Sequence, residues 1–247
     1  MLLEDRSHAL VTAALLLFLL CLPSVCAAKV YVVAVGISDY PGTRNDLLLP
    51  AEDAKTVKWL YEKNSASGSV LLVNSQATAQ NIIDAMLSLF ANAGANDIVV
   101  LFFSGHGVKG SFCAYDSFLS YTRIIKAMSK SKSRNKIIFA DACFAGKMRG
   151  TGGGADDETT VKDARVMLFL SSRSNEKSME RKSMSNGLFT TYLVRGLRGR
   201  ADINRDRIIT ARELYEYVRK RVAEVSGDRQ HPVMWGRFPD TMPVMVW

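Results

Sequence analysis

Five near-continuous runs of apolar residues divide the chain, and polar or amphipathic stretches lie between them. The runs cover residues 29–37, 70–74, 97–103, 136–140 and 166–170. Uninterrupted apolar runs of this length are typical of strands that are buried on both faces, as in a parallel sheet. We therefore predict five buried strands, with a further short strand at 232–235.

Helical patterns alternate with these runs. They cover residues 52–63, 78–91, 121–128, 188–197 and 210–225, and the second of them places its large apolar side chains on one face. Strands that alternate with helices indicate a parallel sheet with right-handed crossovers and with helices packed on both faces. The pattern therefore predicts an α/β fold.

Composition narrows the class of protein. The chain has 247 residues, of which 48% are apolar and 23% charged, four cysteines and a net charge of +8. These values are ordinary for one globular domain and exclude a disulfide-dense miniprotein, a collagen, an acidic disordered chain and a polytopic membrane protein. Lys and Arg are scattered, with no run typical of a nucleic-acid-binding arm, so we expect no nucleic-acid partner.

The first 28 residues have the features of a secretory signal peptide. Residues 9–22 are apolar and uncharged, and small residues follow up to Ala28. We predict an exported protein, periplasmic, cell-surface or extracellular, with no stable membrane insertion after the signal is removed, because about fourteen apolar residues are few for a bilayer. Glu4 and Asp5 are unusual at the start of a signal and keep an uncleaved membrane anchor as the alternative. Cleavage would leave a net charge of +9 and only Cys113 and Cys143.

Two chemically capable residues follow neighbouring predicted strands. His106 lies in Ser104-Gly-His-Gly107 after the third run, and Cys143 lies in Asp141-Ala-Cys143 after the fourth. Ligands of parallel sheets bind at the carboxyl ends of the strands. If the two strands are neighbours, the imidazole can generate the nucleophilic thiolate. A single histidine or cysteine is more often structural, and a disulfide between Cys113 and Cys143 is the alternative, but the two motifs together favour catalysis.

These motifs resemble a known family. Phe103-Ser-Gly-His-Gly107 and Asp141-Ala-Cys-Phe-Ala-Gly146 are similar to the two catalytic motifs of caspase-like cysteine peptidases, in the branch of metacaspases and bacterial caspase homologues. The resemblance covers roughly residues 29–236, with supporting matches at residues 35–40, 49–54, 171–172 and 187–190. It implies a caspase-like three-layer fold with a large-subunit-like part (29–147), a linker loop (148–165) and a small-subunit-like part (166–247).

The resemblance also implies an activity. Cys143 would be the nucleophile that forms an acyl-enzyme, His106 the general base and acid, and the Gly107 amide part of the oxyanion hole. In the family a backbone carbonyl orients the histidine, so no triad acid is required. A related acyl transferase and a catalytically silent binding or scaffold protein of the same fold are the alternatives.

Local charge predicts the substrate. Side chains alternate along a strand, so Asp141 points the same way as Cys143. With Asp53 and Ser104, which match the metacaspase subsite positions, it would form an acidic pocket that selects Arg or Lys in protein or peptide substrates. Asp53 would otherwise interact with the first turn of its own helix. Pro50 stands where the family has a cysteine, a departure at the wall of the pocket.

Two loops carry further predictions. Basic residues at positions 147, 149, 162 and 165 flank a Gly-rich, then acidic stretch at 150–158, so we expect self-cleavage between residues 146 and 166. Residues 202–213 match a calcium-loop pattern at Asp202, Asn204, Asp206 and Glu213, but Arg207 stands where glycine is needed. Thr210 and Glu213 would instead form a capping box. We therefore assign no metal ligand and require no cofactor, and calcium stays an alternative as an activator.

Overall fold

The fold is seen in a computed structural model that describes residues 28–64, 66–108, 110–142, 165–173 and 185–247. Four features that the sequence predicts fall outside these residues: the signal peptide, Cys143, Gly146 and the linker loop up to residue 164.

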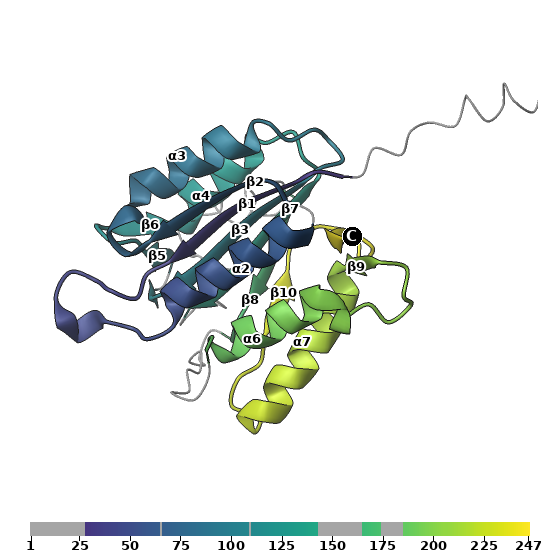
Figure 1. Ribbon diagram of the computed structural model, residues 1–247. Coiled ribbons are helices and arrows are strands. Elements are labelled where there is room, and N and C mark those ends of the chain that lie inside the picture. Colours follow the sequence, from purple (N-terminus) through teal and green to yellow (C-terminus); the bar gives the residue numbers. More distant parts are fainter. Residues whose placement is uncertain (1–27, 65, 109, 143–164, 174–184) are drawn as a thin grey trace, which may run out of the picture.

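A six-stranded sheet forms the centre of the described chain (Figure 1). The strand order is β10-β8-β7-β3-β1-β2. All neighbouring pairs are parallel except β10 with β8, which is antiparallel. The bounds are β1 (Val30–Gly36), β2 (Ala66–Val73), β3 (Ile98–Gly105), β7 (Asn135–Ala142), β8 (Val166–Leu170) and β10 (Val233–Trp235). The predicted α/β fold with a mostly parallel sheet is confirmed.

The helices cover both faces of this sheet and make three layers. One face is packed by α3 (Ala79–Phe90) and α4 (Tyr121–Ser129), and the other by α2 (Pro50–Asn64), α6 (Leu188–Arg195) and α7 (Ala211–Ser226). Side chains that alternate along each strand pack into the hydrophobic cores on opposite faces of the sheet. In β1, Val33 packs on the face covered by α3 and α4, and Val32 packs on the face covered by α2. Both sides of the sheet are therefore apolar, which explains the continuous apolar runs.

β2 begins four residues earlier than the apolar pattern predicts. Its first half, residues 66–69, is small and polar, yet it pairs in parallel with β1. β2 is an edge strand whose side chains stay half-buried, so pairing there does not require an apolar run.

Two small sheets complete the described fold. β4 (Gly107–Val108), β5 (Ser111–Cys113) and β6 (Phe118–Ser120) follow His106, and Cys113 is the last residue of β5. β9 (Ile208–Thr210) pairs with β11 (Pro243–Val246). The apolar pattern predicts neither of these two strands, because each is only three or four residues long and is defined by its distant partner.

α6 is followed by an irregular turn. α6 ends at Arg195, and a single π-helical turn, η4 (Gly196–Arg200), follows it. Gly199 in that turn has a φ of 100°, a conformation that favours glycine. Within the described ranges, no helix has both the length and the apolar character needed to cross a bilayer.

Candidate active site

The carboxyl ends of β3 and β7 lie side by side, as the dyad requires. The two strands are parallel neighbours in register, and their last pair is Gly105 with Ala142. His106 follows Gly105 directly, and in the sequence Cys143 follows Ala142. Cys143 itself lies outside the described residues, so the dyad stays a prediction that rests on the neighbouring strand ends.

Backbone and side-chain groups hold His106 in place. Its Nε2 lies 2.8 Å from the carbonyl oxygen of Asn45, the last residue of the short 3-10 helix η1 (Thr43–Asn45). A carbonyl oxygen only accepts hydrogen bonds, so this contact selects the tautomer that carries its proton on Nε2 and leaves Nδ1 as the unprotonated ring nitrogen. A backbone carbonyl thus orients the ring, and no carboxylate is needed for that purpose.

Tyr40 also helps to hold His106 in place, through a hydrogen bond to its backbone and a contact between the two rings. The backbone N–H of His106 donates to Tyr40 Oη at 2.9 Å, and the Tyr40 hydroxyl donates to the backbone carbonyl of Cys113 at 3.1 Å. The two rings lie 5.0 Å apart between centroids. Burial raises the pKa of Tyr40, which keeps its hydroxyl protonated and able to donate. A Cβ on Gly105 would come within 2.7 Å of Tyr40 Oη, so the close approach requires glycine.

The three residues predicted for the substrate pocket come together below this rim. Asp53 lies in the first turn of α2, Ser104 near the end of β3, and Asp141 on β7, paired with Ser104. The Ser104 hydroxyl donates to Asp53 Oδ2 at 2.9 Å. All three are buried; the exposed fraction is 1% for Asp53 and 7% for Asp141. Two adjacent carboxylates therefore lie inside the protein.

The start of α6 supplies further partners of these acids. The Asn186 amide and the Gly187 N–H donate to Asp53 Oδ1 at 2.8 and 3.0 Å. The Thr190 hydroxyl donates to Asp141 Oδ2 at 2.9 Å. A Cβ on Gly187 would lie 2.6 Å from Asp141 Oδ2 and 3.2 Å from Asp53 Oδ2. Glycine is therefore the residue that lets the helix start approach both carboxylates.

Asp53 lies in the first turn of α2, where its charge can interact with the helix start, and its part in a substrate pocket stays a prediction. Its carboxylate bonds to β3 and to the residues before α6, not to the first turn of its own helix. Sequence reasoning missed the roles of Asn186, Gly187 and Thr190, and those of Tyr40 and Asn45. For Tyr40, Gly187 and Thr190 the signal was present, since they lie in segments that carry the family resemblance.

Burial and mutual repulsion both disfavour the charged forms of the acidic pair, Asp53 and Asp141. Burial first, and then the charge of Asp141, raise the pKa of Asp53 to about 8, against the hydrogen bonds from Asn186, Ser104 and Gly187. These three partners are all uncharged. Near neutral pH Asp53 is therefore largely protonated, and a cation placed beside it would favour its ionisation.

Comparisons with known proteins identify the family. The family model for the caspase domain matches residues 29–241. The chain belongs to the caspase-domain family. A solved structure, protein GSU0716 from Geobacter sulfurreducens, shares this fold with a TM-score of 0.67 and 17% sequence identity, over 88% of this chain and 97% of that one. At this identity the likeness shows the fold alone. The search of curated proteins gave no match.

The calcium-pattern loop of this caspase domain is used differently. The Thr210 N–H and hydroxyl both donate to Glu213 Oε2, and the Glu213 N–H returns a bond to Thr210 Oγ1, so the capping box forms. Arg207 takes the left-handed conformation, φ 66°, that glycine was expected to provide. Asp202 Oδ1 is buried without a hydrogen-bond partner. Even so, no three His, Cys, Asp or Glu side chains of the described chain lie together as metal ligands.

Cys113 is a free thiol in the caspase domain. Its side chain is half-buried in β5, and desolvation raises its pKa. The disulfide that the sequence left open for Cys113 is not formed, and a thiol with a raised pKa is a poor nucleophile.

Proposed function

We propose that this caspase domain is a cysteine endopeptidase that cleaves peptide bonds after Arg or Lys. The observation that carries the proposal is the register of β3 and β7, which puts His106 at the same rim as the residue preceding Cys143, directly above the buried pair Asp53 and Asp141. Membership of the caspase-domain family supports a peptidase and protein substrates.

The chemistry follows from the orientation of His106. Nδ1 takes the proton of the Cys143 thiol, and the thiolate attacks the scissile carbonyl carbon. The N–H groups of Gly107 and Cys143 donate to the developing oxyanion. The imidazolium then protonates the leaving amine, which departs and leaves a thioester. Water, deprotonated by Nδ1, hydrolyses the thioester, and the released thiol regains its proton.

The acidic pair provides the specificity in this mechanism. A guanidinium has several N–H donors in one plane and bonds well to carboxylates, and an ammonium offers a point charge. Either cation would offset the repulsion between Asp53 and Asp141. Glycine at position 187 lets the start of α6 lie against both carboxylates, since a Cβ there would come within 2.6 Å of Asp141 Oδ2.

No cofactor takes part in this mechanism. Calcium as an activator stays a prediction, and the commitment of Glu213 to the capping box argues against a requirement for it. Export after cleavage of a signal at residues 1–28 also stays a prediction.

Covalent labelling tests nucleophile and pocket together. A peptidyl-arginine chloromethyl ketone should add once to the full chain under reducing conditions, with EGTA as well as with calcium, and peptide mapping should place the adduct on Cys143. The aspartyl analogue should not label, because the pocket is acidic. Absence of any adduct in intact-mass spectra would favour the catalytically silent binding protein. Labelling that requires calcium would contradict the cofactor-free mechanism.

Self-processing is a second consequence. Segment 146–166 carries four basic residues, Lys147, Arg149, Lys162 and Arg165, and we expect the wild-type chain to cut itself after at least one of them. Intact-mass analysis should show fragments for the wild type and a single full-length mass for Cys143→Ala. A full-length mass for both proteins after prolonged incubation would refute self-cleavage.

A further inference from the structure

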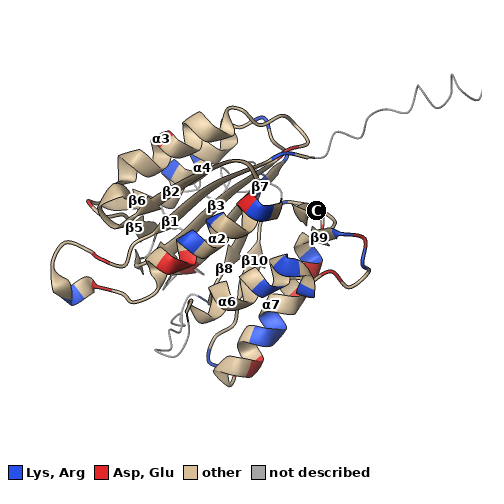
Figure 2. Ribbon diagram, viewed as in Figure 1, with Lys and Arg blue, Asp and Glu red and all other residues tan. Residues whose placement is uncertain are grey.

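We propose that a groove between α6, η4 and α7 binds an acidic stretch of the polypeptide substrate, outside the site of chemistry; this inference rests on the proposed peptidase function. The groove has a volume of about 710 Å³. We call it the arginine groove, and its lining is Tyr192, Arg195, Arg198, Arg200, Tyr217, Arg221 and Val225. Figure 2 shows basic residues gathered along these elements.

Among the described residues, the lining carries four arginines and no acidic residue. The carboxylates of α7 beside it are already paired: Glu224 accepts from Arg221 at 3.2 Å, and Glu216 accepts from Arg212 at 2.9 Å. Arg221 is itself one of the four, so an anion that enters the groove would meet the guanidinium groups of Arg195, Arg198 and Arg200 as the remaining positive charges. Several carboxylates in a row are the ligand chemistry that such a surface fits.

Stacking arranges the guanidinium groups for binding. Arg195 lies over the ring of Tyr192, with 5.2 Å between its Cζ and the ring centroid. Arg198 lies over the exposed ring of Trp59, with 5.4 Å between the corresponding points. A stacked guanidinium uses its flat face on the ring and keeps N–H donors at its edge. The side chains are thus held in place before a ligand arrives, which lowers the entropy lost on binding.

The same stacking favours a peptide over a single-stranded nucleic acid. Nucleic-acid grooves of that kind offer open aromatic faces on which bases stack. In the arginine groove, Arg195 lies over Tyr192 and Arg221 lies 6.0 Å over Tyr217. One face of each tyrosine ring is thus covered by a guanidinium group, and the donors at the guanidinium edges remain for carboxylates.

A second groove connects this surface to the proposed specificity site. It has a volume of about 380 Å³, shares Arg195 and Arg198 with the arginine groove, and extends to Asn186. Asn186 is the residue whose amide donates to Asp53. A chain lying along both grooves would place carboxylates among the arginines and lead toward the acidic pair. A polypeptide with an acidic stretch a few residues from an Arg or Lys has this arrangement of charges.

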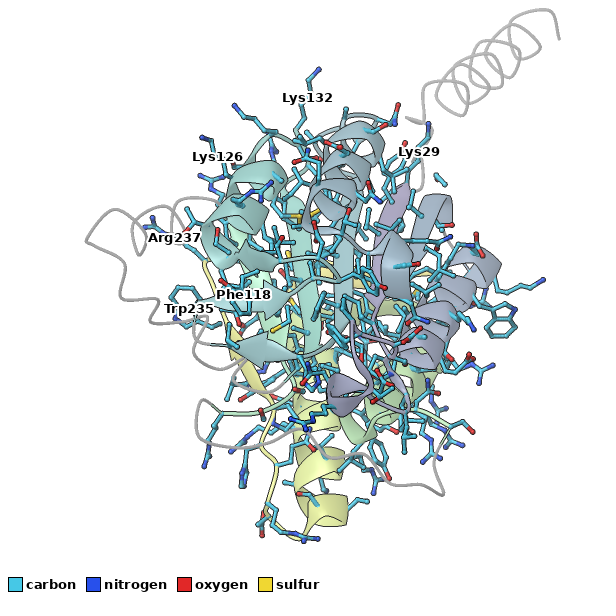
Figure 3. All side chains as sticks on the ribbon, turned by 90° about the vertical axis from the view of Figure 1, so that its left-hand side faces the viewer. Lys29, Phe118, Lys126, Lys132, Trp235 and Arg237 are labelled. Carbon is cyan, nitrogen blue, oxygen red and sulfur yellow. The ribbon has the colours of Figure 1, made fainter. Side chains whose placement is uncertain are left out.

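Binding to the Cys143→Ala full chain tests the groove without catalysis. The probe is a fluorescent peptide with one Arg and a run of Asp and Glu, followed by anisotropy. Arg195→Gln with Arg198→Gln should weaken binding by about tenfold or more. The matched control is Lys126→Gln with Lys132→Gln, which removes the same charge from the opposite, α4 side, where both side chains reach into solvent (Figure 3). That pair should change Kd less than about twofold.

Three outcomes would overturn the proposal: equal Kd values for the two double variants, equal binding of a probe with alanine in place of the acids, or tighter binding of a single-stranded oligonucleotide than of the acidic peptide. Thermal unfolding checks that both variants fold. In the wild type, adding an acidic extension to an Arg peptide should lower its KM. The double variant Arg195→Gln with Arg198→Gln should abolish this decrease in KM, while it cleaves a short Arg peptide as the wild type does. Failure to cleave any Arg peptide would refute the peptidase function, whereas the binding result would still decide the groove.

Discussion

Replacing Cys143 with alanine should reduce kcat for an Arg-containing fluorogenic peptide by at least about 10⁴-fold. The variant keeps the acidic pair and the oxyanion donor but loses the only group that forms the thioester. His106→Ala should cost nearly as much, because the thiol is then not deprotonated efficiently. The double variant should be little worse than either single one, since residues that act as a unit lose their effect together.

Cys113→Ala is the matched control for this experiment. Cys113 is the other cysteine of the chain after residue 28, and it is half-buried with a raised pKa. Its substitution should leave kcat/KM within about twofold, because a small half-buried side chain is lost and no reacting atom is touched. Activity of Cys143→Ala within tenfold of wild type, or loss of activity in Cys113→Ala alone, would contradict the assignment of the nucleophile.

The fold was predictable where burial is two-sided. β3, β7 and β8 are covered by helices on both faces and therefore appear in the sequence as plain apolar runs. β2 lies at the sheet edge, and β9 pairs only with β11, more than thirty residues away in the sequence. The first half of β2 and the whole of β9 depend on a partner strand rather than on their own composition, so the apolar pattern reveals only the second half of β2.

The same distinction applies to the site. His106 follows the end of β3, and Asp141 lies on β7, so strand ends alone indicated that they share a rim. The Asn45 carbonyl and the Asn186 amide reach the site from segments 61 and 133 residues away from the side chains they contact. One contact uses a main-chain oxygen, which every residue has. The identity of residue 45 therefore could not predict the contact between its carbonyl oxygen and His106.

Asp53→Asn should both weaken Arg recognition and stabilise the protein at alkaline pH. Asparagine has the same shape: its Oδ1 can accept from Asn186 and Gly187, and its Nδ2 can donate to the Ser104 hydroxyl. A bound guanidinium would favour ionisation of Asp53, and asparagine cannot supply that charge, so kcat/KM for an Arg substrate should fall by about 100-fold. The pocket would then be intact in shape but short of one negative charge.

The stability effect has a defined direction with pH. The folded-state pKa of Asp53, about 8, lies above its ordinary value of 3.8. Between these values folded wild type holds a proton that the unfolded chain releases, so its free energy of unfolding falls as pH rises from about 4 to about 8. The amide that replaces this carboxyl in Asp53→Asn does not titrate and would have no such dependence. At pH 8.5 we therefore expect Asp53→Asn to be more stable than wild type by about 1 to 3 kcal/mol, and at pH 4 to show little or no gain.

Urea unfolding at both pH values measures this difference, and the control is Asp39→Asn. Asp39 lies on the loop after β1, it is exposed, and it is not among the groups that shift the pKa of Asp53. That variant should follow the wild-type pH dependence and keep the wild-type kcat/KM. A gain for Asp53→Asn that is the same at pH 4 and pH 8.5 would mean that packing, not charge, is responsible. A gain at pH 8.5 together with lost Arg cleavage would show that the protein keeps a destabilising carboxylate because its substrate needs it.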